Sequence, residues 1–138
     1  MVHFLTNMDI KNAFIQGLWK SIPSDSDVSW VHNLATLPAS DKPCGDLTDL
    51  VRKMISAGIS KEDVARFAKI TAYDAVFSMC YYLDDYFEAK EFFEPGFDGG
   101  WGLFETNEED LPIAPLGGLH EMLISGDPSG REMRPPSE

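Results

Sequence analysis

Residues 60–87 read SKEDVARFAKITAYDAVFSMCYYLDDYF, a long stretch with the spacing of a helix. Apolar residues recur at intervals of three and four from Val64 to Tyr86, which places them on one helix face. A second apolar set, which includes Phe77 and Cys80, covers most of the remaining surface. Because a helix that is apolar nearly all round is typical of a protein interior, we predict that this segment is the buried centre of the fold.

The start and the continuity of this helix depend on particular residues. Ser60 is a suitable N-cap, since its hydroxyl can accept a hydrogen bond from the backbone N–H of Asp63. A helix of this length spans roughly 40 Å. The β-branched Ile70 and Thr71 weaken helix formation, so the pattern leaves open whether the helix is continuous or broken near Ile70.

Three shorter amphipathic helices are predicted before it, over residues 8–21, 24–37 and 46–57. Each follows or begins with Ser, Thr, Asn or Asp residues that suit an N-cap. Gly58 suits the left-handed residue that ends the third of these helices. Because the connection to Ser60 is so short, the third helix and the long helix are predicted to be neighbours.

A short β element is predicted in the C-terminal third. Residues 101–105 (WGLFE) alternate enough to form a strand, and residues 113–116 would pair with it as a minimal hairpin. Pro112 and Pro115 leave two alternatives open, an edge strand or no strand at all. The same pattern reading predicts a last short helix over residues 116–125 and a tight turn at residues 127–130.

These elements predict a mainly α fold. We expect a single-domain bundle of four to five helices around a long buried central helix, with a short β element and an irregular C-terminal third. The chain has 138 residues, of which 43% are hydrophobic, enough to bury a core without a metal or a disulfide. Within one domain, the helical core is expected at about residues 7–93 and an acidic, partly irregular segment at about residues 94–138.

The net charge of −12 is concentrated towards the C-terminus. Residues 1–83 hold nine acidic and eight basic side chains, whereas residues 84–138 hold fourteen acidic and three basic ones. A field of this sign repels nucleic acid and anionic membranes and attracts basic partners. We therefore expect a basic protein partner, and no binding to nucleic acid or to a membrane.

Cysteine content and hydropathy bear on the compartment. No apolar run approaches the roughly 20 residues that a bilayer span requires, and the N-terminus lacks the pattern of a signal peptide. Cys44 and Cys80 do not resemble the paired framework of secreted chains, although a disulfide between them stays open. We expect reduced thiols and a cytoplasmic protein.

Four residues are candidates for acid–base chemistry or ligand binding: Asp84, Asp85, His120 and Glu121. Grouped carboxylates could bind a divalent cation or act as acid and base, whereas the alternative is a solvated acidic helix end. The His120–Glu121 pair lacks the second histidine of a zinc protease, because position 124 is Ile124. With three histidines and no GxSxG motif, the sequence favours a protein without metal, cofactor or enzymatic activity.

Aromatic side chains gather around the end of the long helix, in the acidic region. Exposed aromatics rimmed by charge suit protein interfaces, whereas buried ones would belong to the core. The candidate binding surface comprises Tyr81, Tyr82, Tyr86, Phe92, Phe93, Phe97 and Trp101. Self-association to a homo-oligomer through the same aromatics is a further alternative.

Three residues are candidates for structural ion pairs: Asp74, Arg131 and Arg134. A buried Asp74 would need an arginine partner, and an exposed one would need none. The two arginines follow a tight turn in the acidic half of the chain. We expect them to fold back onto carboxylates, namely Asp84, Asp85 or Glu121.

The C-terminal segment GLHEMLISGDPSGREMRP, together with CYYLDD and WGLFE, resembles in pattern a group of small bacterial proteins of uncharacterised function. The resemblance covers the last part of the chain only. It implies neither an activity nor a site.

Two functions of different classes follow from these residues. The first is a cytoplasmic, acidic protein-interaction module, such as an inhibitor or an immunity-type protein, that binds a basic partner. The alternative is a small enzyme or a ligand- or metal-binding domain, with its carboxylate and histidine cluster between the central helix and the C-terminal segment. Convergence of the four candidate side chains on one cavity would favour the alternative, and their scatter over the surface would favour the first.

Overall fold

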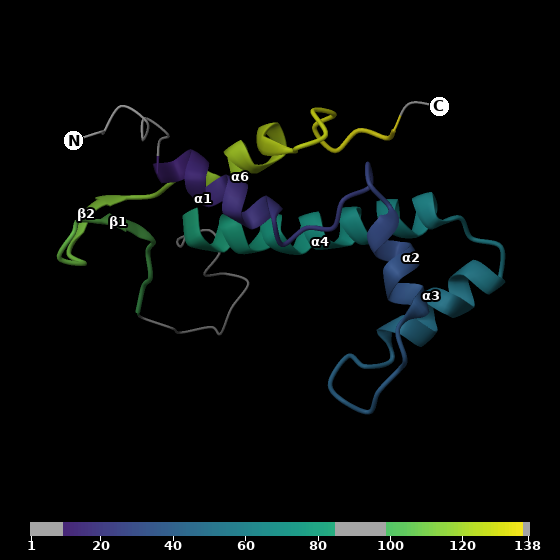
Figure 1. Ribbon diagram of the computed structural model, residues 1–138. Coiled ribbons are helices and arrows are strands. Elements are labelled where there is room, and N and C mark those ends of the chain that lie inside the picture. The colour runs from purple at the N-terminus through teal and green to yellow at the C-terminus, as the bar shows by residue number, and fades with distance from the viewer. Residues whose placement is uncertain (1–9, 85–98, 137–138) are drawn as a thin grey trace, which may run out of the picture. The chain divides into compact units, whose positions relative to one another are not determined.

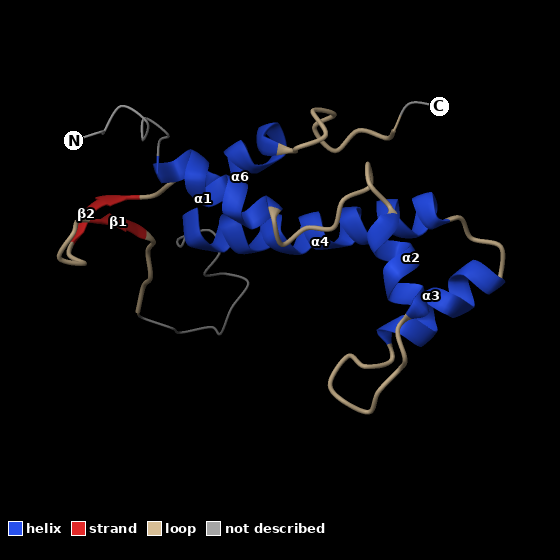
Figure 2. Cartoon of the chain, in the orientation of Figure 1, coloured by secondary structure: helices blue, strands red, loops and turns tan. Residues whose placement is uncertain are grey.

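The computed structural model describes residues 10–84 and 99–136. Within these ranges the chain is mainly helical, with one antiparallel sheet of two strands (Figures 1 and 2). The predicted mainly α fold, with a long helix and a short β element, is confirmed. By their contacts the residues form two compact units: unit 1 is Met1–Ser21 with Asp74–Glu138, and unit 2 is Ile22–Tyr73. The expectation of a single domain stays a prediction.

Unit 2 is built from α2 (Ser29–Thr36), α3 (Leu47–Ser56) and the first half of α4 (Lys61–Asp84). The helices bury apolar positions of one face each, because amphipathic helices pack through their apolar stripes. The core consists of Val31, Val51, Val64 and Ala65. Partly buried side chains from α2 and α3, such as Leu34 and Met54, surround it.

Helix α2 begins later than the sequence pattern indicated. The predicted first turn at residues 24–28 is instead a pair of side-chain turns, in which Ser24 Oγ accepts hydrogen bonds from the backbone of Ser26 and Asp27, both at 3.1 Å. Asp27 Oδ1 then accepts from the backbone N–H of Ser29 at 3.0 Å, and this bond lowers the pKa of Asp27. Ser and Asp side chains compete with helical hydrogen bonding in this way, which explains the wrong start.

The junction of α3 and α4 follows its predicted chemistry. Gly58 adopts a left-handed conformation, with φ of 95°, and the backbone N–H of Ile59 donates to the carbonyl of Met54 at 3.1 Å. This is the pattern that closes a helix C-terminus. Ser60 Oγ then accepts from the backbone N–H of Asp63 at 3.0 Å, as expected of the N-cap of α4.

Helix α4 runs without a break from Lys61 to Asp84. The Thr71 hydroxyl donates to the carbonyls of Phe67 and Ala68 at 3.0 and 3.1 Å, so the β-branched position is accommodated inside the helix. Burial is less complete than predicted. Phe67 is 65% exposed and Met79 60% exposed, whereas Ala65 and Cys80 are buried. The helix therefore buries some of its faces and leaves apolar side chains on others.

In unit 1, α1 (Ile10–Trp19), α6 (Leu119–Leu123) and the 3-10 turn Ile124–Gly126 share a core. Leu119 and Leu123 are fully buried, as predicted for this short helix, and Trp19 Nε1–H donates to the carbonyl of Leu123 at 2.9 Å. A Cβ on Gly126 would lie 2.8 Å from Ile15 Cγ2 and 3.1 Å from Trp19 Nε1. The close approach of Trp19 to this turn therefore depends on glycine.

The predicted hairpin is confirmed as β1 (Phe104–Thr106) paired with β2 (Pro112–Pro115) (Figure 2). The strands are antiparallel, with Phe104 opposite Pro115 and Thr106 opposite Pro112. Both prolines are tolerated because the alternation of an antiparallel ladder turns every second N–H away from the neighbouring strand.

A buried ion-pair cluster in unit 2 was not predicted. The Asp25 side chain is 1% exposed, and its carboxylate oxygens lie 3.2 Å from Lys69 Nζ and 3.2 Å from Arg66 Nη1. Lys69 lies on α4, and its own side chain is buried. The carboxylate thus compensates two cations, one of which is buried.

Replacing Asp25 with alanine should therefore lower the free energy of unfolding by about 3–5 kcal/mol, because it removes a carboxylate that compensates buried positive charge. Urea unfolding followed by circular dichroism measures the change. Asp41→Ala is the matched control, since Asp41 lies exposed in a loop of the same unit and should change stability by less than about 0.5 kcal/mol. Equal stability of the two variants would contradict a structural role for the cluster.

Candidate functional site: the Asp84–His120 pair and the acidic hairpin

Two of the four acid–base candidates meet in unit 1. His120 Nδ1 lies 2.6 Å from Asp84 Oδ2, and the backbone N–H of His120 donates to the same oxygen at 2.7 Å. The Asp84 side chain is 3% exposed and that of His120 is 22% exposed. Within the described part of the chain, Asp84 Oδ1 is buried without a hydrogen-bond partner. The pair is thus a partly buried histidine held by a buried carboxylate.

Local structure explains why these residues meet. Gly118 precedes α6 in a left-handed conformation, with φ of 72°, and provides no side chain to cap the helix. Asp84, at the last residue of α4, accepts the His120 N–H instead. A carboxylate at a helix start is favoured both by the free N–H groups and by the helix dipole. The Asp84 carboxylate therefore has a structural function as the cap of α6.

Aromatic rings on the same face of α4 hold the histidine ring. The Phe77 ring meets that of His120 edge to face at 5.8 Å and 85°, and the Tyr81 ring does so at 5.3 Å and 78°. Residues 77, 81 and 84 lie on one helix face because they are spaced by four and three. Such edge contacts stabilise a ring in one orientation, so His120 presents Nδ1 to the carboxylate.

The other two acid–base candidates do not complete a site. Glu121 is 78% exposed, and its Oε1 lies 4.0 Å from His120 Nε2. Asp85 lies outside the described residues. No three His, Cys, Asp or Glu side chains of residues 10–84 and 99–136 gather closely enough to hold a metal ion.

Of the predicted aromatic surface, three residues are described. Tyr81 and Tyr82 line a pocket of about 280 Å³ together with Phe77 and Ser78. Trp101 is half-buried, and its Nε1–H donates to the carbonyl of Tyr82 at 2.6 Å. These aromatics therefore have structural contacts as well as accessible edges. Tyr86, Phe92, Phe93 and Phe97 lie outside the described residues.

The candidate ion-pair residues lie on the surface. Asp74 is exposed and so needs no buried partner. Arg131 and Arg134 each donate to the other's carbonyl, at 2.8 and 3.3 Å, and Arg134 lies 3.5 Å from Glu132. The expected contacts of these arginines with Asp84, Asp85 or Glu121 stay a prediction, because Asp85 lies outside the described residues.

The segment after α6 is ordered by Asp127, the first residue of the predicted turn, whose side chain also bonds backbone beyond the turn. Its Oδ1 accepts hydrogen bonds from the backbone and the hydroxyl of Ser129, both at 3.0 Å, and its Oδ2 accepts from the backbone of Met133 at 2.9 Å. The predicted turn is confirmed by the bond from Gly130 N–H to the Asp127 carbonyl, 2.9 Å long. A short polar side chain that bonds nearby backbone is the signal that could have identified this role.

Among the described residues of unit 1, the hairpin combines exposed apolar side chains with exposed acidic ones. Phe104, Leu111 and Ile113 are each at least half exposed. The loop between the strands holds Glu108, Glu109 and Asp110, all exposed, and the sequence contains no lysine or arginine between Lys90 and Arg131. We call these six residues, with Glu105 on β1, the hairpin surface.

The acidic loop has a defined conformation. Asn107 Oδ1 accepts hydrogen bonds from the backbone N–H groups of Glu109 and Leu111, at 2.8 and 3.1 Å, and Asp110 adopts a left-handed conformation. Such turns are typical of asparagine and fix the loop without using the carboxylates. The negative charges are therefore held outward by the backbone and stay available to solvent.

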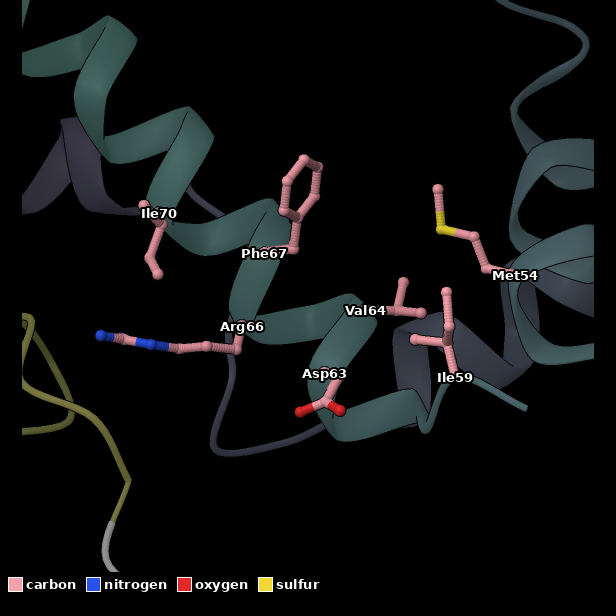
Figure 3. A pocket seen from close by; sticks show the side chains of 7 residues that line it. All are labelled: Met54, Ile59, Asp63, Val64, Arg66, Phe67 and Ile70. Atoms are coloured by element: carbon pink, nitrogen blue, oxygen red, sulfur yellow. The ribbon is translucent and has the colours of Figure 1, made fainter. Parts of the chain in front are cut away.

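A second exposed apolar surface lies in unit 2. Figure 3 shows a groove of about 500 Å³, lined by Met54, Ile59, Asp63, Val64, Arg66, Phe67 and Ile70. Arg66 points away from Met54 in this view and bonds to Asp25, so the lining near Met54 is apolar. The sequence pattern assigned Phe67 and Ile70 to the interior. Exposed apolar grooves of this size are typical of binding surfaces.

No protein-family model, curated protein or solved structure matches this chain. No helix within the described residues is long and apolar enough to cross a bilayer.

Replacing His120 with alanine should lower the free energy of unfolding by about 1.5–3 kcal/mol, because a buried carboxylate loses a charge-assisted hydrogen bond. Urea unfolding gives the change. Glu121→Ala, one residue further along the same helix, should stay within about 0.5 kcal/mol of the unmodified chain. A His120→Ala variant as stable as Glu121→Ala would show that the pair contributes nothing to the fold.

The two cysteines differ in accessibility and in acidity. Both are free; Cys44 is exposed and Cys80 is buried. Burial raises the pKa of the Cys80 thiol to about 11, and the negative charge of Asp84 adds to the shift. Since the thiolate is the reactive form, Cys80 is unreactive at neutral pH.

At pH 8, iodoacetamide should modify Cys44 in the native protein and leave Cys80 unmodified until urea unfolds the chain. Mass spectrometry of intact protein and of its peptides measures both sites. A Cys44→Ser variant serves as the control and should take up no label while folded. Native labelling of Cys80 at the rate of Cys44 would contradict the burial of its thiol.

Proposed function

We propose that this chain is an acidic protein-interaction module that binds a basic protein partner through the hairpin surface. The observation that carries the proposal is the exposure of Phe104, Leu111 and Ile113 beside a loop of fixed acidic residues. Apolar contact area next to uncompensated charge suits an interface whose partner has the opposite charge. The net charge of −12 supports the same choice of partner.

The proposal extends to the type and the location of the module. A compact acidic protein that presents carboxylates on a fixed loop suits the role of an inhibitor or immunity-type protein that covers a basic site on another protein. Two free thiols support a cytoplasmic location, because thiols persist in reducing compartments.

A second candidate function is supported by one observation, the Asp84–His120 pair. A histidine oriented by a buried carboxylate is a common arrangement for general acid–base catalysis, with the second ring nitrogen as the acting group. Here the same carboxylate also accepts the backbone N–H of His120, which a structural cap requires. We therefore rank a small enzyme or ligand-binding domain below the interaction module.

The proposed function can be tested with a pair of charge-matched variants. A partner would be captured on the immobilised chain at low salt, identified, and titrated by calorimetry. Changing Glu108 and Glu109 together to glutamine should weaken its binding by up to about tenfold, because two exposed charges of an interface are lost. The difference in affinity between this variant and the unmodified chain should diminish at about 0.5 M salt, because salt at this concentration screens exposed charges.

The control changes Asp41 to asparagine and Glu62 to glutamine, which alters the net charge equally but in unit 2. This variant should bind as the unmodified chain does. If both variants bind the partner equally weakly, the net charge of the chain and not the hairpin surface determines the affinity. If salt changes neither variant's affinity, the proposal of a basic partner is overturned.

A further inference from the structure

The two edges of the hairpin differ in their free backbone groups. The N–H of Leu116 donates to the carbonyl of Leu103 at 2.8 Å, and the N–H of Asn107 donates to the carbonyl of Leu111 at 2.9 Å. Residues 103 and 107 therefore point their backbone groups towards β2. By alternation, Phe104 and Thr106 point theirs away from β2. No described residue forms a third strand there.

The outer edge of β2 lacks the corresponding donors. Pro115 lies opposite Phe104 and Pro112 opposite Thr106, so prolines occupy the β2 positions that face outward. A proline has no N–H and blocks the addition of a strand. The register shift between Glu105 and Thr106 places the extra residue on β2, so the alternation along β1 is not interrupted. Only the β1 edge thus presents both donors and acceptors.

We propose that the β1 edge receives an extended basic segment of a partner protein, which adds to the hairpin as a third strand. This inference rests on the proposed function and specifies how the partner binds. Addition to an exposed edge supplies main-chain hydrogen bonds, and the side chains of the added strand supply specificity. Lysine or arginine on the segment would face Glu105 and the acidic loop, while its apolar side chains would contact Phe104.

Charge decides between a basic segment and a second copy of this chain. Two copies paired antiparallel through β1 about Glu105 would bring Glu105 of one chain opposite that of the other. Like charges opposite one another destabilise strand pairing. A segment rich in lysine or arginine turns the same charges into an attraction and is therefore the occupant that the hairpin favours.

The test uses the full chain and an eight-residue peptide that alternates valine with lysine or arginine. A second peptide of the same sequence carries N-methyl groups on every second backbone amide. It keeps the charge and the side chains but cannot form the main-chain hydrogen bonds of an added strand. Fluorescence anisotropy measures both affinities. N-methylation should weaken binding about tenfold or more, because the main-chain hydrogen bonds are lost.

Amide hydrogen exchange locates the contact. Saturating peptide should slow exchange at Phe104 and Thr106 by at least about tenfold, and should change Glu105 little because its N–H already faces β2. Changing Glu108 and Glu109 to glutamine should weaken both peptides equally, since this change removes charge and leaves the β1 edge intact.

The outcomes separate the two proposals. If the change of Glu108 and Glu109 weakens peptide binding but N-methylation does not, strand addition is overturned and the proposal of a basic partner stands. If neither peptide binds, both are overturned. If Phe104 and Thr106 become protected as the chain concentration rises without peptide, the edge pairs with a second copy, and the basic occupant is overturned.

Discussion

The fold of unit 1 depends on a buried carboxylate at the end of α4. The burial of the Asp84 side chain, which is 3% exposed, carries a desolvation cost. Two hydrogen bonds from His120 to one of its oxygens offset that cost. They also fix the start of α6, which Gly118 leaves without a side-chain cap. Because α6 brings Leu119 and Leu123 to Trp19, the core of the unit depends on this contact.

The acidic residues of unit 1 that the structure describes include two kinds, which differ in what their carboxylates contact. Asp84 and Asp127 are buried and organise backbone, whereas Glu108, Glu109 and Asp110 lie on a loop that Asn107 fixes. Structural carboxylates accept specific hydrogen bonds, so their charge is largely compensated. The loop carboxylates have no such function, and their charge therefore determines the field that an approaching partner meets.

Local signals explain which parts of the fold could be predicted. The Ser60 cap, the left-handed Gly58 and the hairpin each depend on residues within a few positions of one another. The predicted start of α2 was wrong because the side chains of Ser24 and Asp27 accept hydrogen bonds from nearby backbone N–H groups and form turns. The predicted burial of Phe67 was wrong for a different reason. Apolar periodicity indicates which faces could be covered, and it does not indicate whether another element covers them.

Long-range pairs account for what the sequence could not provide. Asp84 and His120 were both candidates by residue type, but their meeting depends on a contact across 36 positions. Asp25 likewise meets Arg66 and Lys69, which follow it in the sequence by 41 and 44 positions. No local pattern marks Asp25 as buried. The burial of Lys69 on α4 is itself a feature of the tertiary fold, which the sequence pattern did not mark. The identity of the acid that Lys69 meets depends on the tertiary fold as well.

The two edges of the hairpin show why its acidic residues are more than a defence against aggregation. Natural sheets protect their edges with proline or with charge. On β2 the protection is permanent, because Pro112 and Pro115 remove the donors. On β1 the donors remain, and among the described residues it is negative charge that opposes pairing. We propose that this charge disfavours a second copy of the chain and is neutralised by a basic strand, so that the β1 edge is selective where the β2 edge is closed.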